Sequence, residues 1–173
     1  MKYIADKEVD ERASLVVDLL ANKGWTISFA ESCTAGLAAA HLVDVPSASN
    51  VLESSFVTYS NKAKIELCCV SESTIKKKGV VSEDVAVQMA IGIAHVNRAN
   101  IGVGISGYAG PTGGTQEAPV GTVCFGFYIN GSTMSTTKHF GNIGRDGVRI
   151  ASVNYVYDYL ASMLPKIIST DSE

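Results

Sequence analysis

Hydrophobic residues along the chain switch between helical spacing and short continuous runs, which predicts helices interleaved with buried strands. Apolar side chains recur every three or four residues over residues 7–22 and again over 83–97, as on the buried face of a helix. The runs "WTISFA" (25–30), "SSFVTYS" (54–60) and "IGVGIS" (101–106) are short and largely apolar. Runs of this length and composition are typical of strands in a sheet that is covered on both faces.

Residues with special backbone preferences mark where the helices begin and end. Gly24 ends the first helix, Ser82 caps the helix over 83–97, and Gly79 closes a helical turn formed by "STIKKKG". We expect another helix to begin between Ser32 and Thr34 and to end before Pro46. Asn61 is the expected N-cap of a short helix over 62–68.

The last third of the chain reads as a hairpin followed by a helix. The segments "VGTVCFGFYI" and "STMSTTKHF" flank Asn130 and Gly131, a dipeptide that strongly favours a tight hairpin turn. A final helix is predicted from Arg145 to about Leu164, with a disordered acidic tail over 165–173.

These elements predict one α/β domain over residues 1–173, a three-layer α/β/α sandwich on a mixed, mostly parallel sheet with a C-terminal antiparallel hairpin. Ligand sites in such sheets lie at the carboxyl ends of the strands. The polar loops 30–35, 58–62 and 106–119 follow predicted strands. We therefore expect them to converge on a single site.

Composition narrows the function classes. The net charge is −3 and charged residues make up 18% of the chain, which argues against broad nucleic-acid binding or polybasic membrane binding but leaves room for one local anion pocket. None of the four cysteines forms a CxxC pair, the start has no apolar signal-peptide core, and no run reaches the length of a membrane span. A reduced, cytoplasmic location is the expectation.

The segment "AESCTAG" joins a predicted strand to a predicted helix. Free N–H groups at such a helix start would suit an anion, while plain capping by Ser32 or Thr34 is the simpler interpretation. Cys33 could act as a nucleophile there, but a buried structural thiol is the favoured interpretation because no histidine is placed by the sequence as its base.

The loop "GYAGPTGGTQEAPVG" (107–121) is the most glycine-rich part of the chain. Gly107 and Gly110 permit close approach of backbone to a ligand. The loop matches neither the phosphate-loop nor the dinucleotide fingerprint, so ATP and NAD are not favoured. The alternative is an ordinary surface loop, although structureless loops of this length are uncommon.

Lys64 follows Tyr59 at the end of a predicted strand. A lysine near the positive start of a helix, or a buried one, can be held neutral and act as a general base. The simpler alternative is an exposed lysine. Spacing does not identify the serine that such a base would serve, and no zinc-binding cluster or GxSxG elbow is present. The serines in plausible stretches are Ser32, Ser47, Ser49, Ser54, Ser55, Ser60 and Ser106.

Four segments together resemble one family. They are "FAESCTAG", "VTYSNKAK", "GVVSEDVAVQMA" and "ISGYAGPTGGTQEAPVGTV", and they occur in order within residues 5–163. The chain resembles the C-terminal domain of competence-damage-inducible (CinA-type) proteins, whose stand-alone form is the bacterial nicotinamide-mononucleotide deamidase. The resemblance implies an α/β/α fold and a metal-free, cofactor-free amidohydrolase that converts nicotinamide mononucleotide and water to nicotinic acid mononucleotide and ammonia.

The resemblance also implies roles for individual residues. Ser49 would attack the carboxamide, neutral Lys64 would take its proton and Tyr59 would assist. The phosphate would meet the helix start after the first strand, with Arg145 as a cationic clamp. The full set of expected substrate-binding residues is Ser32, Cys33, Thr34, Gly36, Ser106, Gly107, Ala109, Gly110 and Arg145.

Two departures from the family pattern bear on the site. Ala35 stands where glycine is common, and its methyl group could crowd a ligand. Lys62 brings a positive charge near Lys64 and would lower the pKa of Lys64 if the two were close.

Two alternatives remain open from the sequence. Ser32 rather than Ser49 could be the nucleophile, and the chain could be a non-catalytic nucleotide-binding or regulatory module. The expected partners are a small nucleotide and further copies of the chain, because the family usually forms symmetric dimers or larger assemblies; no nucleic-acid or membrane partner is expected.

Overall fold

The computed structural model describes residues 7–170. The elements follow the order that the hydrophobic pattern predicts, with helices interleaved between strands and a hairpin before the last helix. They are α1 (Lys7–Lys23), β1 (Ile27–Glu31), α2 (Leu37–Val43), the 3₁₀ helix η1 (Ala48–Asn50), β2 (Leu52–Val57), α3 (Asn61–Cys68), α4 (Glu72–Lys78), α5 (Glu83–Asn97), β3 (Ile101–Gly107), β4 (Thr122–Ile129), β5 (Ser132–His139) and α6 (Arg145–Thr170).

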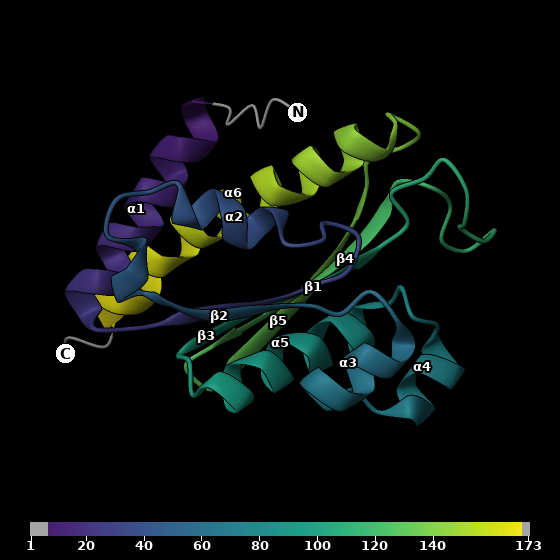
Figure 1. Ribbon diagram of the computed structural model, residues 1–173, viewed down its shortest axis with the longest axis horizontal. Coiled ribbons are helices and arrows are strands. Elements are labelled where there is room, and N and C mark those ends of the chain that lie inside the picture. Colours follow the sequence, from purple (N-terminus) through teal and green to yellow (C-terminus); the bar gives the residue numbers. More distant parts are fainter. Residues whose placement is uncertain (1–6, 171–173) are drawn as a thin grey trace.

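The strands form one mixed sheet in the order β2-β1-β3-β4-β5. The three strands β2, β1 and β3 are parallel, and β4 and β5 join antiparallel. Helices α1, α2 and α6 cover one face, and α3, α4 and α5 cover the other (Figure 1). The predicted three-layer α/β/α sandwich with a terminal hairpin is therefore confirmed.

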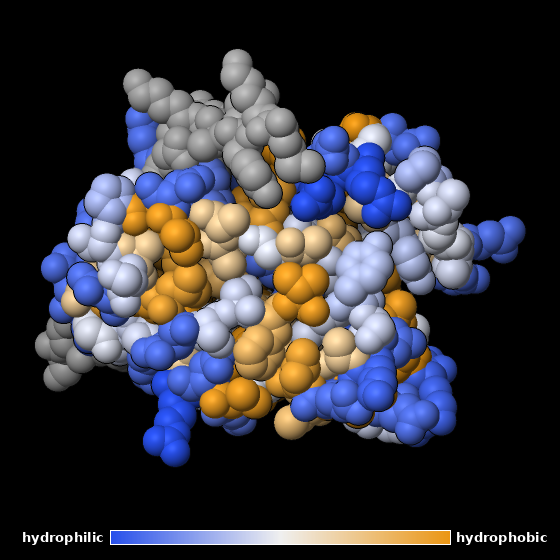
Figure 2. All heavy atoms as spheres, viewed as in Figure 1, coloured by the Kyte–Doolittle hydropathy of each residue, from blue (hydrophilic) through white to orange (hydrophobic). Residues whose placement is uncertain are grey.

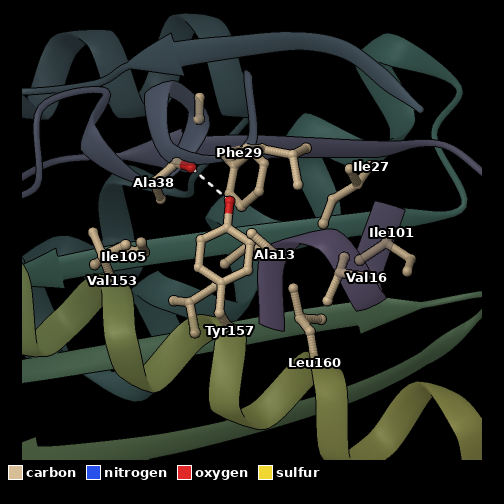
Figure 3. Packing of buried hydrophobic residues seen from close by; sticks show 14 of the residues in the cluster. Ala13, Val16, Ile27, Phe29, Ala38, Ile101, Ile105, Val153, Tyr157 and Leu160 are labelled. Atoms are coloured by element: carbon tan, nitrogen blue, oxygen red, sulfur yellow. Dashed lines mark hydrogen bonds between the residues drawn. The ribbon is translucent and has the colours of Figure 1, made fainter. Parts of the chain in front are cut away.

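The larger hydrophobic core lies between the sheet and the layer of α1, α2 and α6. Figure 3 shows Tyr157 of α6 within it, where its ring lies near Phe29 and its hydroxyl donates a hydrogen bond to the Ala38 carbonyl at 2.7 Å. On the other face α5 packs very closely on β3. A Cβ atom at Gly104 would overlap the carbonyl oxygen of Ala86, so this glycine sets the spacing between helix and sheet.

Apolar side chains of α2, β2 and α3 reach the surface. Figure 2 shows apolar surface mixed with polar groups across the face on which β2 lies in Figure 1. Val43, Val57 and Leu67 are 60%, 49% and 42% exposed. Among the described residues, no helix is long and apolar enough to cross a membrane.

Predictions that rested on local backbone preferences are confirmed. Gly24, with φ 67°, follows the end of α1, and Gly79, with φ 83°, follows α4. Ser82 caps α5 by accepting a hydrogen bond from the Val85 N–H. Asn130 and Gly131 both have positive φ, 44° and 96°, as the predicted hairpin turn requires.

Two helix starts were predicted wrongly. α2 begins at Leu37 rather than near Ser32 to Thr34, because Ala35 (φ 52°) and Gly36 (φ 87°) are left-handed and cannot belong to the helix. The N-cap of α3 is Ser60, whose hydroxyl accepts from the Ala63 N–H at 3.0 Å, and not Asn61.

The last helix is longer than predicted. It continues through Pro165 to Thr170, so the part of the expected tail at 165–170 is helical, and residues 171–173 lie outside the described residues. Ile167 and Ile168 pack against the core cluster. That burial offsets the cost of a proline inside the helix.

Candidate active site

The three polar loops expected to converge line one pocket. It has a volume of about 260 Å³ and lies at the carboxyl ends of β1, β2 and β3, where parallel α/β sheets commonly bind ligands. The lining residues are Ser32, Cys33, Tyr59, Asn61, Lys64, Val80, Val81, Ser106, Gly107, Tyr108, Ala109, Gly110, Thr112, Gly113 and Arg145.

Lys64 is a buried lysine in this pocket. Its side chain extends from α3, whose start is fixed by the Ser60 cap, and only 1% of the residue is exposed. The ammonium donates hydrogen bonds to Ser32 Oγ at 3.0 Å and to the Thr58 carbonyl oxygen at 2.7 Å. An exposed surface lysine, the simpler alternative, is therefore excluded.

Burial changes the chemistry of this lysine. It lowers the pKa of Lys64 from 10.5 to about 8 because the charged form loses its hydration. Lys62, which we expected to contribute a like charge, instead pairs with Glu66 at 3.7 Å on the surface. At neutral pH roughly a tenth of Lys64 is then the free amine, the form that can accept a proton.

Ser32 is the serine that the fold places beside Lys64. It directly follows β1, its N–H donates to the Ile105 carbonyl at 3.0 Å, and the residue is 8% exposed. A serine hydroxyl at hydrogen-bonding distance from a lysine of lowered pKa is the arrangement that nucleophilic catalysis requires.

Ser49 is not brought to Lys64. It lies exposed in η1, at the amino end of β2, whereas Lys64 follows the carboxyl end of the same strand. A strand of six residues spans roughly 20 Å. Ser49 and Lys64 therefore stand at opposite ends of β2, and this placement does not bring together the pair that we expected.

The start of α2 is already occupied by a carboxylate. Glu31 is fully buried, and its two oxygens accept hydrogen bonds from the N–H groups of Gly36 (3.0 Å), Ala38 (3.1 Å) and Ala39 (2.9 Å). The expected phosphate cradle at this helix start is therefore filled by the protein itself. Gly36 does not line the pocket, and neither does Thr34, whose carbonyl accepts from Arg149 at 3.1 Å.

Cys33 lines the pocket but is poorly suited to be a nucleophile. Burial raises the pKa of its thiol from 9.0 to about 12, and the thiolate is the reactive form. The interpretation as a structural thiol fits this environment.

The remaining predicted binding residues reach the pocket. Tyr59 stands at its edge with 64% of the residue exposed, and Arg145 is an exposed residue at the first position of α6. Ser106 Oγ donates to the Val80 carbonyl at 2.8 Å. Gly107, Ala109 and Gly110 also line the pocket.

Several pocket residues were not predicted. Asn61 was assigned only a capping role, and Tyr108 and Thr112 were treated as loop. Val80 and Val81 precede the α5 cap, and nothing in their pattern pointed to a site. Within the described part of the chain, no three His, Cys, Asp or Glu side chains are grouped as ligands for a metal ion.

Sequence comparison identifies related proteins. The CinA C-terminal domain model matches residues 9–164. A nicotinamide-nucleotide amidohydrolase PncC of Enterobacter agglomerans is 43% identical over 147 residues, which are 85% of this chain and 90% of that protein. A CinA-like protein of Kosmotoga olearia is 40% identical over 167 residues, 96% of this chain. The chain spans only about 40% of the length of that longer relative.

Solved structures agree with the sequence matches. The competence/damage inducible protein CihA of Agrobacterium tumefaciens superposes with a TM-score of 0.88 and 36% identity, covering 94% of this chain and 98% of that one. A CinA superfamily protein of Escherichia coli has a TM-score of 0.85 and 28% identity, covering 94% of each chain. With its sequence and fold in agreement, the chain belongs to the family of CinA C-terminal domains.

Proposed function

We propose that the chain is a serine amidohydrolase that converts nicotinamide mononucleotide and water to nicotinic acid mononucleotide and ammonia, with Ser32 as nucleophile and Lys64 as general base. One observation carries the chemistry: the buried Lys64 amine lies 3.0 Å from Ser32 Oγ at the pocket wall. The choice of substrate is supported by the similarity to the nicotinamide-nucleotide amidohydrolase PncC of Enterobacter agglomerans.

The two hydrogen bonds of Lys64 suit proton transfer. The protonated amine donates to both Ser32 Oγ and the Thr58 carbonyl. Once neutral, the nitrogen keeps a donor toward Thr58 and turns its lone pair toward Ser32. The serine hydroxyl can then donate its proton as its oxygen attacks, which makes Lys64 the base for that step.

The reaction then follows two acyl-transfer steps. Ser32 Oγ forms a bond to the carboxamide carbon, and its proton passes to Lys64. The carbon–nitrogen bond breaks, and ammonia leaves with the proton returned by Lys64. Water, deprotonated by the same amine, attacks the acyl-enzyme and releases the carboxylate and Ser32. We assign stabilisation of the oxyanion to backbone N–H groups of the loop after β3, which lines the pocket at Ala109 and Gly110.

The rest of the substrate is oriented by groups at the pocket rim. Because Glu31 fills the α2 start, the phosphate is assigned to Arg145 at the start of α6, where an arginine fork and the helix dipole both favour an anion. Tyr59 is assigned to contact with the pyridinium ring, whose positive charge an aromatic face attracts.

The proposal is tested by ammonia release from nicotinamide mononucleotide by the purified chain and by the Lys64→Met variant, with and without EDTA. We expect turnover by the wild type that EDTA does not reduce and that the variant lacks. Activity lost in EDTA and restored by zinc would contradict the mechanism. A silent wild type whose melting temperature the nucleotide raises would show a binding module instead.

A further inference from the structure

Glu31 is a buried charge without a part in the chemistry proposed above. It is fully buried, and its carboxylate accepts three backbone hydrogen bonds from Gly36, Ala38 and Ala39. Burying a carboxylate is costly even when it is well paired. A serine or threonine cap would satisfy a helix start at far lower cost, so capping alone does not account for this residue.

The three hydrogen bonds close a small loop around the proposed nucleophile. Glu31 immediately precedes Ser32, and the N–H groups that it holds begin at Gly36, so the carboxylate ties the end of the turn back to its beginning. Within the turn the Ala35 N–H donates to the Ser32 carbonyl at 3.1 Å. The left-handed conformations of Ala35 and Gly36 are held in this closed shape.

The backbone of Glu31 is also linked, through Thr58, to Lys64, the hydrogen-bond partner of Ser32. Its carbonyl oxygen accepts from the Thr58 N–H at 2.7 Å. The carbonyl of Thr58 in turn accepts from the Lys64 amine at 2.7 Å. Glu31 therefore has two links to the site. Its side chain anchors the turn that carries Ser32, and its backbone carbonyl anchors Thr58, which accepts a hydrogen bond from Lys64.

We infer that Glu31 is a positioning residue, whose carboxylate fixes the Ser32–Gly36 turn so that Ser32 Oγ stays at hydrogen-bonding distance from Lys64. The inference rests on the proposed function, because it gives Ser32 the role of nucleophile. Glu31 itself does not touch the pocket.

The test compares Glu31→Gln with a matched control, Tyr157→Phe. Glutamine keeps the size but presents an NH₂ group to N–H donors, so at least one of the three hydrogen bonds is lost. Tyr157→Phe removes the buried hydrogen bond from Tyr157 to the Ala38 carbonyl, which lies in α2, the helix that follows the turn. It leaves the hydrogen bonds of the Ser32–Gly36 turn in place. Each protein is assayed for ammonia release and for the rate at which a fluorophosphonate probe labels Ser32, both well below its melting temperature.

We expect Glu31→Gln to lower kcat about tenfold to a hundredfold, the effect of displacing a reacting group by about 1 Å. KM should change less than about threefold, and labelling of Ser32 should slow with kcat. The pH at half-maximal rate should stay where it is, because Lys64 remains buried. Tyr157→Phe should keep kcat within about twofold of the wild type.

Other outcomes overturn the inference. Wild-type kcat and labelling in Glu31→Gln would show that the carboxylate does not position Ser32, and equal losses in Tyr157→Phe would show only general support of α2. If Glu31→Gln does not fold, Glu31→Asp replaces it, and undiminished kcat there would refute the role. If wild-type Ser32 is labelled but the nucleotide is not turned over, the proposed substrate is refuted. The labelling rates of the variants then decide whether Glu31 positions Ser32. A wild type that is not labelled at Ser32 would overturn both proposals.

Discussion

Replacing the buried lysine should separate stability from activity. In Lys64→Met a side chain of similar length and no charge fills the same space, and the general base is lost. A pKa lowered from 10.5 to about 8 means that burial of the charged form costs about 3 kcal/mol, at about 1.4 kcal/mol for each pKa unit. Methionine removes that cost at neutral pH but leaves the Thr58 carbonyl without its donor, which costs about 1–2 kcal/mol.

The sign of the pH effect follows from proton binding. Between about pH 8 and 10.5 the unfolded chain holds a proton on Lys64 that the folded chain has released, so the stability of the wild type rises with pH in this range. From pH 7 to about pH 9.5, the free energy of unfolding of the wild type should rise by about 2 kcal/mol more than that of Lys64→Met. The variant should therefore be about 1 kcal/mol more stable at pH 7 and lose that advantage by pH 9.5.

Urea unfolding of both proteins at the two pH values measures this difference, since contributions from the tyrosines and cysteines are common to both. Lys62→Met is the matched control, because the Lys62 side chain is 78% exposed and pairs with Glu66 on the surface. That control should differ from the wild type by the same small amount at both pH values. A Lys64→Met variant that is destabilised equally at pH 7 and 9.5 would refute the claim that Lys64 is buried as a strained charge.

Three further predictions follow from the same structure. In a pH–rate profile kcat/KM should rise about tenfold for each pH unit below 8 and level off above it, as Lys64 loses its proton; a flat profile would count against this base. Gly104→Ala should destabilise the fold by about 3 kcal/mol or more in urea unfolding, because its Cβ overlaps the Ala86 carbonyl, and an unchanged midpoint would contradict the close packing. Arg145→Ala should raise KM for nicotinamide mononucleotide about tenfold or more but leave turnover of nicotinamide riboside, which lacks the phosphate, unchanged. Equal losses on both substrates would show that Arg145 does not bind the phosphate.

The parts of the fold that were predicted correctly depend on neighbouring residues. Ser82 caps α5 because its hydroxyl meets an N–H three residues later, and Asn130–Gly131 forms a hairpin turn because both residues tolerate positive φ. The start of α2 was missed because it depends on Glu31, whose carboxylate lies next to Gly36 only after the turn has folded. The continuation of α6 beyond Pro165 depends on burial of Ile167 and Ile168, which local preference does not include.

The site was predicted in part for a similar reason. The loop that contains Ser106–Gly110 was expected at the site because strand ends in an α/β sheet lie side by side. The role of Lys64 came from the resemblance to the CinA family, because spacing alone left an exposed lysine as the simpler interpretation. The choice between Ser32 and Ser49 could not be made from spacing, since both serines occur near strands. It depends on the edge of the sheet at which each serine lies. Ser32 follows the carboxyl end of β1, whereas Ser49 precedes the amino end of β2, and the parallel pairing of these two strands puts the serines at opposite edges.

Side-by-side turnover of Ser32→Ala and Ser49→Ala tests the central claim most directly. Both variants are incubated with nicotinamide mononucleotide, and ammonia release is compared with that of the wild type. The account predicts that Ser32→Ala loses kcat by about a thousandfold or more while still binding the nucleotide, and that Ser49→Ala stays within about threefold of the wild type. Loss of turnover in Ser49→Ala together with near-normal kcat in Ser32→Ala would contradict it.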